Sequence, residues 1–193
     1  MPAPCQPDLR LATVYRTEDL SQWGTNPSRL AKRLVAEGCL KKLGWGLFVT
    51  TQRSKFGVLP PKDEELLHRF LYKTPFVITG PERWNVLNLG STAVASLRIV
   101  YNQKRSGIFN FDGQKFLLKR IPFPQPITSE WFVVDLIEHR EMVSLTMDLL
   151  EEKLILALKW RRFDPNKLQE MANRFGKKTT MAFVKQVVQA AAS

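Results

Sequence analysis

Positively charged side chains gather between Gly24 and Thr50, where the sequence has five Lys or Arg and a single acidic residue. Ammonium and guanidinium groups neutralise phosphates, and in the grooves of a duplex they also donate hydrogen bonds to base edges. This composition favours non-covalent recognition of a nucleic acid. The residues that we expect to take part are Thr25, Asn26, Ser28, Arg29, Lys32, Arg33, Lys41, Lys42 and Trp45.

Three residues of the second half have the order found in metal-dependent nucleases, namely Asp135, Glu151 and Lys153. In such a site the carboxylates hold Mg²⁺ beside the scissile phosphate. The motif requires its Glu and Lys to alternate along a strand, whereas the leucines around them recur at helical spacing. Residues two apart on a helix point in different directions, so the pattern argues against a nuclease.

Other chemistry-bearing residues are too sparse for a site. His68 and His139 are isolated, and Cys5 and Cys39 have no neighbouring histidine with which to complete a zinc site. The sequence has no phosphate-binding glycine loop and no nucleophile motif. We therefore expect no enzyme activity, no metal and no cofactor.

A helix is predicted over residues 28–37 to present the first group of cations. Asn26 is a favourable N-cap, Pro27 suits the first turn, and Gly38 supplies the positive φ that ends a helix. At 100° per residue the apolar side chains fall on one side and the polar ones on the other. The inward side holds Leu30, Ala31 and Leu34, and the outward side holds Ser28, Arg29, Lys32, Arg33 and Ala36.

The segments on either side of this helix complete a familiar arrangement. Residues 14–24 predict a short helix in which Thr17 could be the cap and Leu20 and Trp23 face inward, and a turn at 24–26 follows. Helix, short turn and second helix form a helix-turn-helix. Upstream, residues 7–12 leave room for barely two turns of a first helix.

Residues 39–50 predict a two-stranded ribbon with a tight turn at Gly44, Trp45 and Gly46. Such a ribbon after a helix-turn-helix is the wing of a winged helix. Lys41 and Lys42 fall on its first strand, where we expect phosphate contacts.

Composition supports a polyanionic partner. The 193 residues carry a formal charge of +11 and a pI of about 9.9, which favours nucleic acid first and an anionic membrane second. No apolar run approaches the ~18 residues of a spanning helix, and the first ten residues lack a secretory pattern. We expect a cytoplasmic protein with reduced thiols and no membrane association.

Residues 53–65 combine Gly, two prolines and charges, and they indicate a linker. The predicted domains are therefore 1–57, a winged helix-turn-helix for DNA binding, and 62–193, a mixed α+β domain ending in a helical segment. The fold class is α+β. The second domain is expected to contain helices at 63–72 and 82–90, strands at 75–80, 96–102 and 131–136, a hairpin at 107–123 around Asp112-Gly113, and helices at 148–160, 165–175 and 178–191.

Two further basic pairs lie in this second domain. Lys104 and Arg105 are on a predicted loop, and Arg161 and Arg162 follow Trp160 at a helix end. Each pair is either a second anion-binding surface or a solvated turn.

The segment from Thr17 to Val49 resembles the N-terminal winged helix of AbiEi-type antitoxins of type IV toxin–antitoxin systems. The resemblance rests on the basic Leu-rich helix, on Gly38-Cys39-Leu40 and on Gly44-Trp45-Gly46-Leu47-Phe48. The second part is similar to the antitoxin domain of the same group through "TPFVITGPERWNVLNLG", "IVYNQKRSG" and the Phe-Pro segment before "EWFVVDL".

This resemblance implies a transcriptional repressor that binds an inverted-repeat operator of double-stranded DNA near its own promoter. It also implies an antitoxin that counteracts a nucleotidyltransferase toxin without a stable complex. Such a protein would be a monomer in solution or a weak dimer that pairs on DNA.

One departure concerns the wing. Such wings usually carry Arg between the glycines, whereas this sequence has Trp45, which either presses on a sugar-phosphate edge or packs on its own domain. A different functional class also stays open: a basic adaptor that binds RNA or a protein through the second domain, with the winged helix as a protein-contact module. Specific duplex binding with a steep salt dependence would separate the two.

Overall fold

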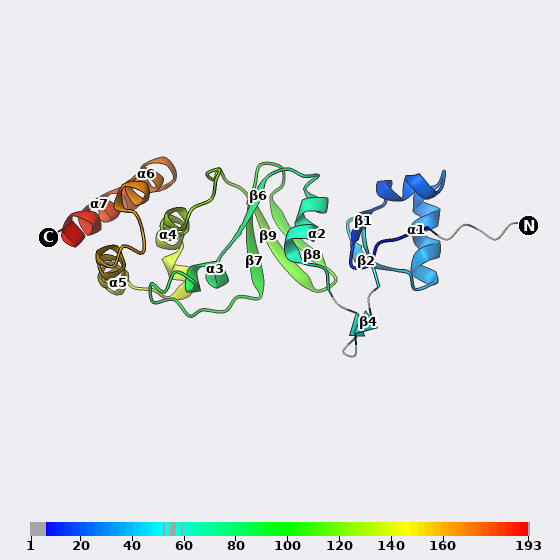
Figure 1. Ribbon diagram of the computed structural model, residues 1–193, viewed down its shortest axis with the longest axis horizontal. Helices are drawn as coiled ribbons and strands as arrows, with labels where there is room; N and C mark the ends of the chain where they lie inside the picture. The colour runs from blue at the N-terminus through cyan, green and yellow to red at the C-terminus, as the bar shows by residue number, and fades with distance from the viewer. Residues whose placement is uncertain (1–6, 52, 55–56, 59, 193) are drawn as a thin grey trace, which may run out of the picture. The chain divides into compact units, whose positions relative to one another are not determined.

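The computed structural model describes residues 7–51, 53–54, 57–58 and 60–192. The chain forms two compact units: unit 1 comprises residues 1–75 and 108–115, and unit 2 comprises 76–107 and 116–193. Figure 1 shows both units, with labels on α1 to α7 and on several of the strands. The units divide the chain at other positions than the predicted limits of 57 and 62.

Unit 1 is built on a three-stranded antiparallel sheet of order β1-β3-β2, with β1 at Val14–Arg16, β2 at Leu40–Gly44 and β3 at Leu47–Thr50. Two short helices precede the hairpin: the 3₁₀ helix η1 at Glu18–Trp23 and the α-helix α1 at Pro27–Ala36. Their apolar sides and the sheet share a core. Its buried members are Tyr15, Leu20, Leu30, Ala31, Leu34, Leu40 and Phe48.

The start of this unit differs from the prediction. Val14–Arg16 is a strand instead of part of a helix, because it pairs with β3 in the register Val14 with Val49. Residues 7–12 contain no helix. The helix predicted after Thr17 forms as the 3₁₀ helix η1, although the Thr17 side chain makes no capping hydrogen bond. Leu20 is fully buried and Trp23 packs at the edge of the core, as predicted.

The predicted linker contains regular structure where it is described. Strands β4 at Arg53–Ser54 and β5 at Gly57–Val58 pair with each other, and α2 follows at Asp63–Phe70. Hydrogen bonds join α2 to β1: Glu65 Oε1 accepts from the Val14 N–H at 2.8 Å, and the Arg16 guanidinium donates to the Arg69 carbonyl at 2.8 Å. These bonds explain why α2 belongs to unit 1.

A four-stranded sheet of order β6-β7-β9-β8 follows in the chain. It comprises β6 at Phe76–Thr79, β7 at Leu97–Asn102, β8 at Gly107–Phe111 and β9 at Gln114–Arg120, with the short helix α3 at Pro81–Asn85 after β6. The hairpin predicted around Asp112-Gly113 is confirmed. Both turn residues have positive φ, 52° and 92°, as a two-residue hairpin turn requires.

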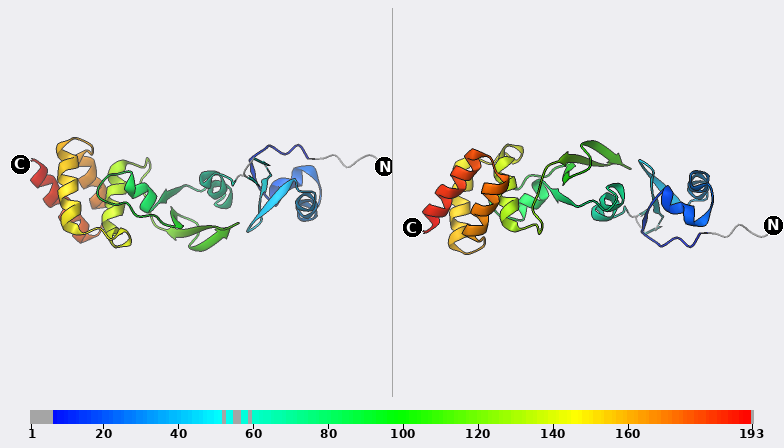
Figure 2. Two further views of the ribbon diagram at one scale, coloured as in Figure 1. Left: turned by 90° about the horizontal axis from the view of Figure 1, so that it is seen from below. Right: turned by 90° about the horizontal axis from the view of Figure 1, so that it is seen from above.

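Helices fill the rest of unit 2. They are α4 at Ser129–Glu138, the 3₁₀ helix η2 at Arg140–Val143, α5 at Met147–Lys159, α6 at Pro165–Phe175 and α7 at Lys178–Ala192. Helix α6 packs against α4 and α7, and α7 packs against α5 (Figure 2). The three predicted terminal helices and the α+β fold class are confirmed.

The strand predicted at 131–136 is wrong, because this segment lies inside α4. Thr128 caps the helix by accepting the Trp131 N–H at 3.3 Å. Nearly every side chain of the segment is buried, so the sequence shows no polar face and no helical period. No helix in the described part of the chain is long and apolar enough to cross a membrane.

Candidate nucleic-acid interface

Local hydrogen bonds fix the first turn of α1. The Asn26 Oδ1 accepts the Arg29 N–H at 3.0 Å, Pro27 occupies the first position, and Gly38 has a φ of 74° just after the helix. The predicted cap and stop of α1 are therefore confirmed. Because its oxygen is engaged as a cap, Asn26 supports the helix, whereas Thr25 is exposed in the turn.

The two sides of α1 divide as predicted. Leu30, Ala31 and Leu34 are at most 7% exposed, and the polar residues of the opposite side face solvent. The Arg33 side chain reaches toward Glu37 at the C-terminal end of the helix, with 3.7 Å between Nε and Oε1. The exposed cations of the helix face are Arg29, Lys32 and Arg33, of which Arg33 has an acidic neighbour.

A groove of about 350 Å³ lies between α1 and the wing. Lys32 reaches it from α1 and Lys42 from β2, while Ala31 and Phe48 contribute apolar surface. Thr17 joins the groove to the wing turn by donating its N–H to the Gly46 carbonyl at 2.9 Å. The lining residues are Thr17, Ser28, Ala31, Lys32, Val35, Lys42, Gly46 and Phe48.

Lys41, by contrast, is engaged within unit 1. Its ammonium is 2.5 Å from the Asp112 carboxylate, and the Asp112 N–H donates to the Leu43 carbonyl at 3.1 Å. Successive side chains of a strand point to opposite faces, which separates Lys41 from Lys42. Of the two predicted phosphate contacts on the wing, Lys42 is therefore the one placed beside α1.

Trp45 packs within its own unit and stays 59% exposed. Its ring meets Phe109 edge to face with 5.2 Å between centroids, and Phe109 in turn meets Phe70 at 4.9 Å. The backbone of Trp45 has a φ of 53° and is followed by Gly46 at 74°, so the wing turns through two left-handed residues. Phe109 lies in the predicted second domain but belongs to unit 1, and the alternative contact of Trp45 with a sugar-phosphate edge stays a prediction.

The residues of the predicted second basic surface come from two separate loops. The buried Asn102 side chain accepts the N–H groups of Lys104 at 2.8 Å and Arg105 at 2.7 Å, which fixes the loop between β7 and β8. After α5, Arg161 and Arg162 are both exposed, and Arg162 donates to the Leu87 carbonyl at 2.8 Å. Arg162 therefore has a structural hydrogen bond within unit 2.

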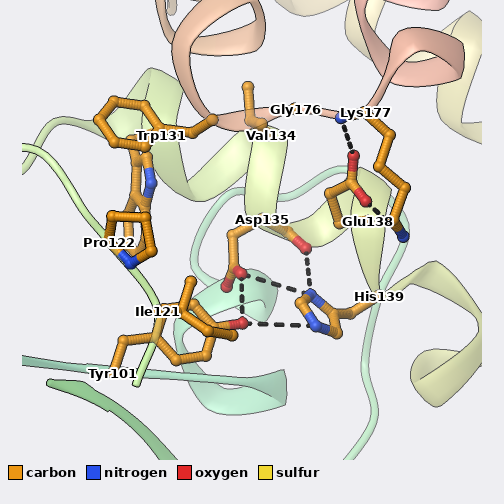
Figure 3. A pocket seen from close by; sticks show the side chains of 11 residues that line it. Tyr101, Ile121, Pro122, Trp131, Val134, Asp135, Glu138, His139, Gly176 and Lys177 are labelled. Atoms are coloured by element: carbon orange, nitrogen blue, oxygen red, sulfur yellow. Dashed lines mark hydrogen bonds and ion pairs between the residues drawn. The ribbon is translucent and has the colours of Figure 1, made fainter. Parts of the chain in front are cut away.

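A buried polar cluster in unit 2 escaped the sequence analysis (Figure 3). Asp135 is 5% exposed and accepts hydrogen bonds from Thr79 Oγ1, from Trp84 Nε1 at 2.9 Å and from Tyr101 Oη at 2.8 Å. The His139 Nδ1 is 3.3 Å from its Oδ1. Asp135 lies in α4 and His139 is the C-cap residue four positions later, a spacing that predicts contact on a helix but is hidden by the wrong strand assignment.

Of the three residues with the order found in nucleases, only Asp135 belongs to this cluster. Glu151 accepts from Gln186 at 2.9 Å, and Lys153 is 3.8 Å from Glu152. These contacts are on α5 and α7, away from the partners of Asp135. The described residues include no group of three or more His, Cys, Asp or Glu that could hold a metal ion.

Electrostatics in this cluster shift the pKa of three groups. The hydrogen bond with Asp135 raises the pKa of His139, against the effect of burial, and burial followed by the charge of Asp135 raises the pKa of Tyr101. Burial opposes ionisation of Glu138, but hydrogen bonds from Lys177 and Thr180 outweigh it and lower the Glu138 pKa. The ionised forms of His139 and Glu138 are thus favoured by their partners.

Comparison with known proteins supports the fold and nothing finer. No protein-family model and no curated protein matches the chain. The crystal structure of the RV2827C protein from Mycobacterium tuberculosis is similar, with a TM-score of 0.52 and 15% sequence identity, over 94% of this chain and 73% of that one. At that identity the likeness concerns the architecture alone.

Proposed function

We propose that this chain is a DNA-binding transcriptional repressor and the antitoxin of a type IV toxin–antitoxin system. The DNA-binding part rests on one observation: Lys32 from α1 and Lys42 from the wing line a single groove. The antitoxin part rests on the resemblance of the sequence to AbiEi-type antitoxins. The two parts are tested separately.

In the proposed complex α1 enters the major groove, which is wide enough for a helix. Arg29 lies in the first turn, where recognition helices reach base edges, and its guanidinium is suited to a guanine. Lys42 contacts a backbone phosphate beside the helix, and Lys32 lies between Arg29 and Lys42. An inverted-repeat operator is then bound by two copies that pair on the DNA.

The two neighbouring lysines of β2 offer a matched experiment. Binding to a duplex from the protein's own promoter is measured by fluorescence anisotropy between low and moderate salt for Lys42→Gln and Lys41→Gln. Lys42→Gln should flatten the slope of log K against log salt by about one unit, because one phosphate contact is lost. Lys41→Gln should leave the slope unchanged, because Lys41 is paired with Asp112.

Two results would contradict the proposed interface. One is an equal effect of both substitutions, and the other is wild-type affinity of a folded Arg29→Ala, Lys32→Ala, Arg33→Ala variant. A shuffled duplex and a structured RNA serve as competitors. Equal binding to RNA with no preference for the promoter would favour the basic adaptor instead.

The antitoxin part predicts a nucleotidyltransferase gene next to this one. It is tested in cells that express that toxin, with both genes under unrelated promoters. The triple Ala variant of α1 should still neutralise the toxin, because transcriptional control is absent from this arrangement. Loss of neutralisation by a variant that is expressed and folded would show that the helix face serves the toxin and not DNA. We place the protein in the cytoplasm, where both targets are found.

A further inference from the structure

Unit 2 contains a pocket of about 310 Å³ that the proposed function does not use (Figure 3). Its walls are mostly flat and apolar, with Trp131 and Phe175 from the helices and Ile121 and Pro122 from the segment after β9. Its polar groups come from Tyr101, Asp135, Glu138, His139 and Lys177. A pocket of this size with apolar walls and a few convergent polar groups is typical of small-ligand sites.

The acidic side chains of this pocket already have several donors each. Asp135 accepts from Thr79, Trp84 and Tyr101 and also has His139 beside it. Glu138 accepts the Lys177 N–H at 2.7 Å and the Thr180 hydroxyl at 2.5 Å, and its Oε2 is 2.7 Å from the Lys177 ammonium. A cationic ligand would therefore have to displace bonds that the fold itself uses.

The hydrogen-bond donors Lys177 and His139, by contrast, could each bind a further acceptor. The Lys177 side chain is 75% exposed and has three N–H groups, of which the ion pair with Glu138 needs one. The His139 Nδ1 lies 2.9 Å from the Asp135 carbonyl, so Nδ1 carries a proton. His139 lines the pocket, and its Nε2 lies 3.4 Å from Tyr101 Oη, a long separation for a charge-assisted hydrogen bond.

A ligand that complements these donors and apolar walls has hydrogen-bond acceptors and a flat apolar group. We propose that the pocket of unit 2 binds a small aromatic anion, a carboxylate or a phosphate monoester, with its ring against Trp131 and Phe175 and its anionic group between His139 and Lys177. This site is independent of the proposed DNA interface and gives the protein a small-molecule ligand.

Protonation of His139 supplies a second argument. The ring contacts Asp135 on α4 and Tyr101 on β7, it stacks on Trp84 with 5.7 Å between centroids, and the charge of Lys119 on β9 acts on it. Asp135 raises the pKa of His139 and the charge of Lys119 opposes this. Because an anion prefers the imidazolium, affinity should fall as pH rises through the pKa of His139, over the range in which the ligand itself is ionised.

The test is calorimetric titration of the full-length protein with benzoate and with phenyl phosphate. Benzamide and benzylamine present the same ring without negative charge, and inorganic phosphate presents the charge without the ring. Binding of at least one aromatic anion, with a Kd on the order of 1 mM or tighter and at least roughly tenfold stronger than the three controls, is expected. The stronger of the two anions identifies the carboxylate or the phosphate monoester.

Two adjacent lysines provide matched variants. Lys177→Gln should weaken the anion roughly tenfold, since a charge-assisted hydrogen bond is lost, and Lys178→Gln on the same exposed turn should have no effect. Both variants keep the backbone N–H of residue 177, which donates to Glu138. Absence of aromatic-anion binding, equal binding of inorganic phosphate, equal binding of benzylamine, or equal effects of the two variants would each overturn the proposal.

Discussion

At position 45 the backbone conformation of the wing turn favours Asn, whereas the contact with Phe109 favours Trp. The stability of a Trp45→Asn variant measures which of these two effects is larger. A two-residue turn with positive φ at both positions favours Asn-Gly, and a bulky residue in the left-handed region costs about 1–2 kcal/mol. Taken alone, the turn predicts that Asn at position 45 stabilises unit 1. The contact of Trp45 with Phe109 predicts the opposite.

The magnitudes favour the contact. Trp45 is 59% exposed, so about two fifths of its surface is buried. For a side chain that buries up to roughly 250 Å², this is about 100 Å² and about 2.5 kcal/mol as an upper estimate. The edge-to-face pair adds about 1 kcal/mol. After the relief of backbone strain, we expect Trp45→Asn to lower the free energy of unfolding by about 2 kcal/mol.

Urea unfolding followed by circular dichroism measures this change, with amide hydrogen exchange at Leu43 and Leu47 as the local readout. The same substitution in a Phe109→Leu background is the control, because its cost should then fall by about 1 kcal/mol if the ring pair carries the effect. A Trp45→Asn variant that is as stable as the parent, or more stable, would show that the turn preference outweighs the contact and that this reasoning is wrong.

The remaining predictions concern the buried cluster of unit 2. Asp135→Asn should destabilise the unit by about 3–5 kcal/mol in thermal or urea unfolding, because the donors Trp84 and Tyr101 and the His139 ring lose their carboxylate partner. The control is Asp148→Asn at an exposed helix start, and an equal cost of the two substitutions would refute the role of the cluster. The raised pKa of His139 means that its stabilisation is complete below its ordinary value of 6.5 and is lost as pH rises through the higher folded value. The free energy of unfolding should therefore fall over that window in the parent protein, and the fall should be smaller in His139→Gln; an identical pH profile for both would contradict the assignment.

The sequence correctly predicts those features that depend on residues close to one another in the chain. The cap at Asn26, the proline after it and the stop at Gly38 determine the limits of α1, and its apolar spacing gives the buried side. The turn at Asp112-Gly113 likewise carries its own conformational requirement. These features depend on residues within a few positions of each other, which a sequence pattern records.

The errors arose where distant residues decide the outcome. Val14–Arg16 is a strand only because β3 is available for pairing, and the sequence around it carries helix-favouring acids at 18 and 19. The segment 131–136 is buried nearly all round, so neither period is visible. The engagement of Lys41 by Asp112 and the gathering of Tyr101 with Asp135 likewise join segments far apart in the chain.

The contacts of the wing have a thermodynamic consequence. Lys41 with Asp112 and Trp45 with Phe109 hold both the strand and the tip of the hairpin in place before any partner arrives. A wing ordered in advance loses little conformational entropy on docking. For the proposed duplex complex, the heat-capacity change should then match the area of a rigid-body interface, without the additional negative contribution of a segment that folds on binding.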